Sequence, residues 1–330
     1  MGHVDVATHV PGKRLIHEQP RAGSGWPLRQ PPLLSEGARV ALVAPAGPLR
    51  DERDLQRAVD NVQSLGWTPV VASNALARAG YFAGDDAQRA LELNRALTDD
   101  AIDGVWCLRG GYGTMRILDT LDYDAFTRRP KPVIGYSDIT ALHAALIARA
   151  GVVTYHGPTA RAALSEFSRE SLYRAVVTGC DPCGGAPGAR TLRSGRADGV
   201  LAGGNLALIA ALAGTPYAPR FDGAIVVLED IDEAVYRVDR MLRQLVMSGM
   251  LDGARAIVFG ACTNCPEASD AGARRLDDVI AETGELLGIP TVSGVPVGHI
   301  DEQWTLPLGA RAVLDADART LTVIRALTTD

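Results

Sequence analysis

Short apolar runs alternate with amphipathic stretches through the first half of the chain. Runs rich in β-branched residues predict strands at 39–45, 68–73, 103–108, 131–137 and 152–156. Helical patterns between them predict helices at 52–65, 86–97, 114–121 and 139–150. Strands that alternate with helices form βαβ units and a mostly parallel sheet, so we expect functional loops at the carboxyl ends of the strands.

The pattern is interrupted at two places. Residues 1–36 are rich in Pro, Gly, Arg and His without a hydrophobic period, which predicts a mobile N-terminal extension. Regular alternation also stops at 164–196, where GCDPCGGAPGAR has six Gly or Pro residues in twelve positions. We therefore place a first domain at 37–163, an inter-domain linker region at 164–196 and a second domain at 197–330.

The second domain has a less regular order of elements than the first. Helical patterns lie at 203–213, 234–247 and 270–287, and strand patterns lie at 224–230, 256–260 and 290–298. Short strands follow to the end of the sequence. This order predicts a mixed α/β domain with more antiparallel strands, so the fold class of the whole chain is α/β.

Composition excludes several classes of protein. The 330 residues are 47% apolar and 22% charged, which is typical of a globular protein with a core that needs no disulfides. Lysine and arginine number 33 against 39 acidic residues, a net charge of −6 without a long basic run, which argues against binding of nucleic acid. Apolar runs such as 206–213 are far shorter than the roughly 20 residues of a membrane span.

Five cysteines and no signal-peptide pattern predict a reducing cytoplasm. Cys180 and Cys183, and likewise Cys262 and Cys265, have the spacing of paired zinc ligands. Nearly eighty residues separate the two pairs, so small residues in loops are a better interpretation than a shared metal site. A redox role is also disfavoured, because neither pair opens a helix after a strand.

Ser137 follows an apolar strand and precedes Asp138 and a helix. A serine at such a turn is exposed above the sheet edge, and the next backbone N–H can stabilise an oxyanion. The final glycine of G-x-S-x-G is missing, which disfavours an ordinary α/β-hydrolase. A plain helix N-cap also explains this serine, and this fragment alone favours the N-cap.

The segment RGGYG at 109–113 follows the third predicted strand. Its glycines let backbone N–H groups approach an anion or a developing oxyanion, although a plain glycine-rich turn explains it equally well. A nucleotide site would need G-x-G-x-x-G after the first strand. Residues 44–48 there read APAGP, and their prolines withhold donors, so we do not expect a nucleotide.

Glu229 and His299 each end an apolar strand pattern, where rigid backbone can aim a side chain. His299 could accept a proton from a serine and Glu229 could fix its tautomer, although a buried histidine and a capping acid are ordinary alternatives. His143 lies inside a helix and His156 precedes Gly-Pro, so both are less well placed. Between two nearby acids, Glu229 is favoured over Glu233 because a strand fixes its backbone.

Five motifs, in this order and spacing, resemble the LD-carboxypeptidases, also called muramoyltetrapeptide carboxypeptidases. They are RGGYG, IGYSDIT, LAGGNLALIAALAGTPY, VVLEDIDEAVYRVDRML and GHIDEQWTLPLGA. The resemblance extends over about residues 39–326. It implies a Rossmann-like N-terminal domain and a β-rich C-terminal domain, with the active site between them and usually a homodimer.

The resemblance also implies a cytoplasmic serine peptidase without metal, nucleotide or other cofactor. It assigns the nucleophile to Ser137, the acid to Glu229 and the base to His299, with an oxyanion hole from the backbone N–H groups of Gly111 and Asp138. The implied reaction releases terminal D-alanine from a murein tetrapeptide, or a related L,D-peptide, during cell-wall recycling. Two alternatives stay open: a self-immunity peptidase that cleaves peptidyl-nucleotide antibiotics with the same triad, and a non-enzymatic nucleotide- or sugar-binding protein.

Overall fold

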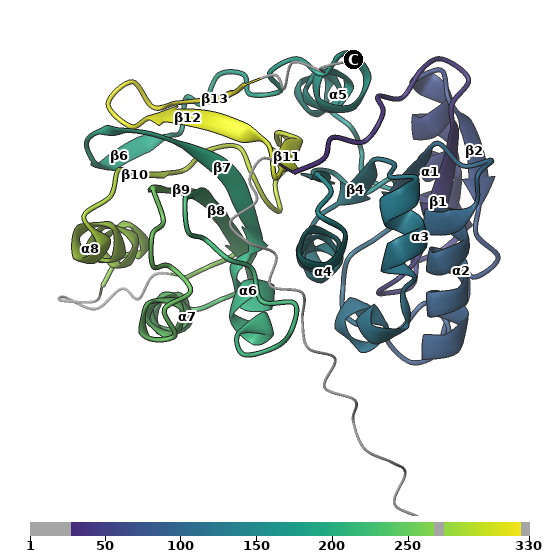
Figure 1. The fold of residues 1–330 in the computed structure, drawn as a ribbon, viewed down its shortest axis with the longest axis horizontal. Coiled ribbons are helices and arrows are strands. Elements are labelled where there is room, and N and C mark those ends of the chain that lie inside the picture. The colour runs from purple at the N-terminus through teal and green to yellow at the C-terminus, as the bar shows by residue number, and fades with distance from the viewer. Residues whose placement is uncertain (1–27, 267–273, 325–330) are drawn as a thin grey trace, which may run out of the picture.

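Two β-sheets, each covered by helices, form the part of the chain that the structure describes (Figure 1). The structure is a computed structural model, and it describes residues 28–266 and 274–324. The first sheet has six strands and the second has seven. The α/β fold class is therefore confirmed.

The first sheet has the strand order β11-β5-β4-β3-β1-β2. Its strands are β1 (Arg39–Val43), β2 (Thr68–Val71), β3 (Gly104–Cys107), β4 (Val133–Gly135), β5 (Thr154–His156) and β11 (Leu306–Leu308). The first five pair in parallel, and β11 pairs antiparallel with β5. The C-terminal part of the chain thus supplies an edge strand to the first sheet, which joins the two halves of the molecule near the centre of Figure 1.

Helices cover both faces of the first sheet. They are α1 (Glu52–Ser64), α2 (Asp86–Thr98), α3 (Tyr123–Arg128), α4 (Thr140–Ala150) and α5 (Glu166–Tyr173). One apolar cluster joins the sheet to α2, α3 and α4, and a second joins the other face to α1 and α5. Aspartate caps start α1 and α2: Asp51 accepts from two backbone N–H groups and Asp85 accepts from that of Gln88.

The helix predicted at 114–121 is wrong. Two 3₁₀ turns, Thr114–Arg116 and Leu118–Thr120, occupy the segment instead. The residue before the first turn is Gly113, which has a φ of 130° and no side chain to cap the turn. So short a segment gains few intrahelical hydrogen bonds to offset the cost of helix nucleation. A further 3₁₀ turn, Ser137–Ile139, precedes α4.

The second sheet has the strand order β13-β12-β7-β8-β9-β10-β6. Its strands are β6 (Arg190–Arg193), β7 (Arg196–Asn205), β8 (Ala224–Ile231), β9 (Ala256–Thr263), β10 (Thr291–Ser293), β12 (Arg311–Asp315) and β13 (Thr320–Val323). Strands β7 to β10 are parallel, whereas β6, β12 and β13 are antiparallel to their neighbours. This mixture is what the sequence predicted for the second domain.

Three helices pack on one face of the second sheet: α6 (Leu206–Leu212), α7 (Val235–Met247) and α8 (Leu276–Leu287). The predicted start of α8 at 270 falls where 267–273 lie outside the described residues. The described helix begins at Leu276, and Asp278 accepts a hydrogen bond from the N–H of Arg275. The strand predicted at 290–298 is shorter than expected, because only Thr291–Ser293 pairs with β9.

Most of the predicted N-terminal extension, at 1–27 with His3, His9 and His17, lies outside the described residues. The prediction is wrong for 28–36, because this segment packs on the first sheet. Arg29 forms a β-bridge with Val152, and Leu34 is buried and donates its N–H to the carbonyl of Val176. A single pair of leucines carries no periodic signal, so only the tertiary contact reveals this order.

The segment 164–196 contains more regular structure than a linker region suggests. It includes α5, a π-helical turn at Arg174–Thr178 and strand β6. Its glycine- and proline-rich part runs between the π-helical turn and β6. The domain boundaries drawn from composition stay a prediction.

Candidate active site

Ser137 stands at the turn between β4 and α4 in a conformation that is rare for a residue with a side chain. Its φ is 65°, in the left-handed region. Such a conformation costs roughly 1–2 kcal/mol and is commonly retained at functional sites. The N-cap of the 3₁₀ turn is Tyr136, with no side-chain capping bond, so the serine hydroxyl is not engaged as an N-cap.

The glycine-rich loop after β3 packs directly against this serine. A Cβ on Gly110 would lie 2.8 Å from Cβ of Ser137 and 2.9 Å from its Oγ, so only glycine fits. The carbonyl of Gly110 accepts from the N–H of Gly47 at 3.0 Å. A trans peptide directs its N–H opposite to its C=O, so this bond also fixes the direction of the Gly111 N–H.

Asp138 ties the glycine-rich loop to the serine turn through its side chain. The residue is buried, and its Oδ2 accepts from the N–H of Thr114 at 2.8 Å. Burial raises the pKa of this carboxyl above its usual range. The sequence singled out the backbone N–H of Asp138; the structure adds a buried carboxylate that holds the end of the loop.

Glu229 and His299 lie in hydrogen-bond contact. Nδ1 of the imidazole is 2.8 Å from Oε2 of Glu229, which is fully buried, and the histidine side chain is 16% exposed. Glu229 lies opposite a bulge in the neighbouring strand β9: Leu228 pairs with Phe259 and Asp230 with Cys262, so β9 has one extra residue there. Irregularities of this kind re-aim a side chain.

Gly298 allows the chain to pass beside the buried acid. Its φ is 114°, and a Cβ there would lie 2.7 Å from Oε2 of Glu229. On the other side, Oγ1 of Thr263 donates to the carbonyl of His299 at 2.8 Å. The backbone around His299 is therefore held by the close packing of Gly298 and by the hydrogen bond from Thr263.

The pair formed by Glu229 and His299, which belongs to the second half of the chain, contacts the turn that holds Ser137. The rings of Tyr136 and His299 have centroids 4.7 Å apart. At the same contact, the N–H of Asn205 donates to Oγ1 of Thr140 at 3.0 Å. The turn after β4 and the end of β8 thus meet at the contact between Tyr136 and His299, and Ser137 follows Tyr136 directly in the chain.

His143 and His156 are enclosed in the protein and are poorly placed to act as bases. Both are fully buried, and burial lowers the pKa of His143 to about 4. Burial, with smaller effects from the charges of His143 and His299, lowers the pKa of His156 to about 3. Both imidazoles are therefore neutral and enclosed.

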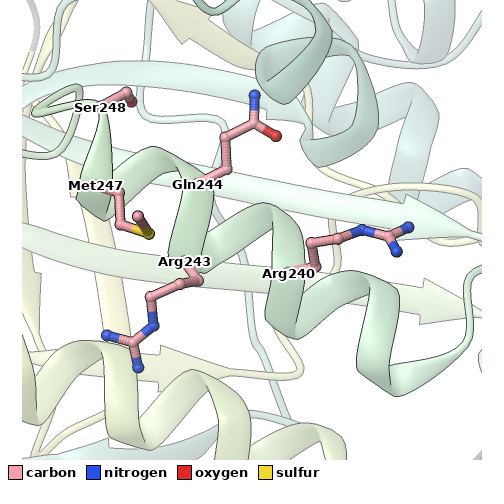
Figure 2. Close-up of a pocket in the computed structure, with 5 residues that line it drawn as sticks. All are labelled: Arg240, Arg243, Gln244, Met247 and Ser248. Carbon is pink, nitrogen blue, oxygen red and sulfur yellow. The ribbon is translucent and has the colours of Figure 1, made fainter.

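A cavity of about 240 Å³ opens beside His299. Tyr136, Arg57 and Arg161 line it together with the histidine. A second hollow lies on the outer side of α7, where Figure 2 shows the residues that line it: Arg240, Arg243, Gln244, Met247 and Ser248. Met247 is 80% exposed, so this hollow is shallow, and it contains none of the candidate catalytic groups.

The interpretation of the second cysteine pair as small loop residues is wrong. Cys262 lies in β9 and forms a disulfide with Cys265. Asn264, with a φ of 54°, turns the chain so that the two Cα atoms lie 5.5 Å apart, which suits a disulfide. Cys180 is exposed and Cys183 is buried as free thiols.

Across residues 28–266 and 274–324, no group of three or more His, Cys, Asp or Glu side chains could hold a metal ion. In the same ranges no helix has both the length and the apolar composition to cross a membrane.

Comparison with known protein families agrees with this arrangement. Residues 40–157 match the LD-carboxypeptidase N-terminal domain, and residues 198–314 match the LD-carboxypeptidase C-terminal domain. The chain belongs to the LD-carboxypeptidase family. The first match ends just after β5 and the second covers most of the second sheet, so each half of the chain corresponds to one domain of the family.

Relatives cover nearly the whole chain. A Streptomyces coelicolor protein whose name describes a carboxypeptidase is 43% identical over 310 residues, 90% of this chain and 97% of the relative. The murein tetrapeptide carboxypeptidase of Pseudomonas aeruginosa is 34% identical over 297 residues, 84% of this chain and 94% of that protein. The predicted family resemblance is thereby confirmed.

Solved structures share the fold. The crystal structure of muramoyltetrapeptide carboxypeptidase from Oxalobacter formigenes has a TM-score of 0.75 and 31% identity, covering 87% of this chain and 98% of its own. The microcin C7 self-immunity protein MccF, in complex with glutamyl sulfamoyl guanosine, has a TM-score of 0.83 at 23% identity, covering 91% and 99%. The second likeness shows the fold alone.

Several residues of the candidate site were not predicted from the sequence. Gly47 lies in the segment that we set aside for its prolines, yet the N–H between them holds the Gly110 carbonyl. Gly298 precedes the histidine, and Arg161 lies in a loop without a pattern. A glycine directly before a candidate base was a usable signal, whereas nothing local marked the other two.

Proposed function

We propose that this LD-carboxypeptidase is a serine peptidase that hydrolyses the L,D-amide before the terminal D-alanine of murein tetrapeptides. The observation that carries the proposal is the 2.8 Å contact between His299 and the buried Glu229, beside the turn that holds Ser137 with φ 65°. Because Nδ1 of the imidazole faces the acid, Nε2 is the nitrogen left to exchange a proton with a serine hydroxyl.

In the proposed reaction, Nε2 of His299 takes the proton of the Ser137 hydroxyl while the serine oxygen bonds to the amide carbon. Glu229 stabilises the imidazolium that forms. The N–H groups of Gly111 and Asp138 are proposed to stabilise the oxyanion, since the Gly47 contact orients the first and the second lies within the 3₁₀ turn Ser137–Ile139.

The tetrahedral intermediate then loses its leaving group. The carbon–nitrogen bond breaks, and the imidazolium gives its proton to the amine of D-alanine. A water molecule next gives a proton to His299 and attacks the acyl-enzyme. This step releases the shortened peptide and restores the Ser137 hydroxyl.

The substrate class comes from the relatives. The names of the Pseudomonas aeruginosa and Oxalobacter formigenes proteins describe carboxypeptidases of murein tetrapeptide and muramoyltetrapeptide. We infer the same class of peptide here, with a role in cell-wall recycling. A cytoplasmic location and a homodimer stay predictions of the sequence.

The second candidate is cleavage of a peptidyl-nucleotide antibiotic. It is supported by a sequence relative, the microcin C7 self-immunity protein MccF of Escherichia coli, which is 26% identical over 303 residues, 81% of this chain and 87% of that protein. The same serine, acid and base would attack an acyl bond in either substrate. A side-by-side assay with an L,D-tetrapeptide and an acyl-sulfamoyl adenylate separates the two, since the preferred substrate gives the larger kcat/KM.

Mass spectrometry of muropeptides after incubation with the purified protein tests the main proposal. We expect loss of one terminal alanine from tetrapeptides and labelling of Ser137 by a fluorophosphonate probe. An unlabelled Ser137 together with no peptide turnover would instead favour a non-enzymatic nucleotide- or sugar-binding protein.

A further inference from the structure

Positive charge gathers on one wall of the cavity beside His299, and the proposed chemistry does not use it. Arg57 of α1 and Arg161 of the loop after β5 both line this cavity. Arg109 begins the glycine-rich loop, and the charge of Arg161 acts on it. Three guanidinium groups therefore lie near the proposed reacting groups.

Asp54 is the buried carboxylate that faces these groups, and it does not neutralise them all. Its Oδ1 lies 3.4 Å from Nη1 of Arg57, and its Oδ2 lies 3.5 Å from Nη1 of Arg161. Direct charge-assisted hydrogen bonds are about 2.7–2.9 Å long, so both pairs are loose. Asp301 also lines the cavity, but it is exposed and screened by water.

The lowered pKa of Arg109 agrees with a local excess of positive charge. Burial lowers the pKa of this guanidinium, and the charges of Arg161 and Arg50 lower it further, against a smaller opposing effect of Asp54. An additional anion in the cavity would relieve this repulsion.

The side chain of Arg161 has an N–H donor without a partner, and hydrogen bonds hold the backbone on both sides of this residue. Among the described residues, its buried Nε has no hydrogen-bond partner. The side-chain amide of Asn61 donates to the carbonyl of Ala160 at 2.7 Å and to that of Ala162 at 2.9 Å, which holds the loop on both sides. A fixed guanidinium with an unused donor suits an anion with two coplanar oxygens.

The cavity has room for the end of a ligand rather than for a whole tetrapeptide. Its volume of about 240 Å³ is below the roughly 300–1,000 Å³ of pockets that enclose drug-sized molecules. The end of the substrate on the leaving-group side carries an α-carboxylate. Its charge and its two coplanar oxygens match what Arg161 offers.

We propose that Arg161, supported by Arg57, binds the terminal α-carboxylate of the peptide substrate. The inference rests on the proposed function and adds the group by which the enzyme recognises the end of the chain. A peptidase that holds a free carboxylate beside its base removes only the last residue. Arg161 would thus set the carboxypeptidase specificity of the site.

The test compares a murein tetrapeptide with the same peptide whose terminal carboxylate is converted to a carboxamide. For the free acid, Arg161→Gln should lower kcat/KM roughly 10- to 100-fold, mainly through KM, because a charge-assisted hydrogen bond is lost. For the wild type, kcat/KM on the carboxamide should be lower than on the free acid by a similar factor. For Arg161→Gln, kcat/KM should be nearly the same on the two peptides. Arg53→Gln is the matched control, since Arg53 lies on α1 with Arg57 and is 88% exposed.

Circular dichroism checks the fold of each variant, and Arg161→Lys keeps the charge without the planar fork. We expect this variant to fall between wild type and Arg161→Gln. If Arg161→Gln lowered kcat/KM by the same factor on the free acid and on the carboxamide, the proposal would be overturned.

Calorimetric titration of Ser137→Ala with both peptides tests the anchor without turnover. Binding that needs the free carboxylate and weakens in the double variant with Arg161→Gln supports the anchor even if no peptide is cleaved, in which case the proposed function alone fails. Equal binding of both peptides, or none of either, overturns the anchor whatever the cleavage assay gives.

Discussion

The turn after β4 and the pair at β8 hold their polar groups in different ways. Ser137 is half-buried, and a left-handed backbone lifts it from the sheet while Gly110 leaves room for its side chain. Glu229 is fully buried, and it is positioned by strand β8, which lies against the bulge of β9, and by its contact with His299. A nucleophile must reach its substrate, whereas an orienting acid works best away from water.

This contrast predicts different sensitivities in the two regions. The serine turn depends on a few adjacent residues and on one glycine loop. The acid and base lie 70 positions apart and depend on packing between β8 and the segment after β10. Substitutions that shift backbone should therefore harm the second region more than the first.

The largest expected effect comes from removing a reacting group in either region. Ser137→Ala and His299→Ala should each lower kcat by several orders of magnitude, roughly 10⁴- to 10⁶-fold, because members of one triad act as a unit. Both variants should unfold at nearly the wild-type denaturant midpoint. Steady-state kinetics on a tetrapeptide measures the loss, and a near-normal rate in either variant would exclude the proposed mechanism.

The next prediction distinguishes Glu229 from Glu233, which lie four residues apart, as the acid that acts on His299. Glu229→Gln should lower kcat roughly 10³- to 10⁴-fold with little change in KM, as in triads whose acid is neutralised. Glu233 makes a 3.5 Å ion pair with Arg237 on the surface, so Glu233→Gln should change the free energy of unfolding by about 1 kcal/mol or less. If Glu233→Gln gave the larger loss in kcat, the acid would be wrongly assigned.

A smaller effect tests the backbone that holds the acid and base pair. Gly298→Ala places a Cβ 2.7 Å from Oε2 of Glu229, and a displacement near 1 Å can cost about 10²-fold in rate. Gly288→Ala is the control, because Gly288 also has a positive φ but nothing within 4 Å of its added Cβ. Both should lose about 1–2 kcal/mol of stability from the left-handed backbone.

Only Gly298→Ala should lose kcat. Equal kcat values in the two glycine variants would show that the Glu229 contact tolerates displacement of the backbone.

The smallest effect concerns the buried histidines behind the site. The pKa of His156 is lowered to about 3, so below the unfolded value near 6.5 the unfolded chain binds a proton that the native protein does not. Stability from this residue is therefore lost as the pH falls from about 6.5 toward 3, at about 1.4 kcal/mol per pH unit.

His156→Leu should flatten the dependence of unfolding free energy on pH between 6.5 and 4. Asp230, whose pKa burial raises to about 6, has the opposite sign, so the difference between variant and wild type is the quantity to compare. Chemical denaturation at several pH values measures it. An unchanged slope would mean that His156 titrates alike in both states.

The sequence alone determined the five parallel strands of the first sheet, the α/β class and the turn at Ser137, because hydrophobic period and turn residues act over short stretches of chain. It did not predict β6 or β7, and it placed the end of β7, at 203–205, in a helical pattern. The apolar strand patterns predicted before Ser137 and at 224–230 correspond to β4 and β8. The motifs around them resembled one family closely enough to assign roles that periodicity left open. Local pattern failed at 114–121, where too few hydrogen bonds support a helix.

Only the tertiary structure decided which distant groups meet. It placed β11 in the first sheet, Leu34 in the core and Cys262 in a disulfide with Cys265. It also set Arg161 beside the cavity of His299. Such contacts join segments that are far apart in sequence, and they depend on how whole sheets and helices pack, which no local preference encodes.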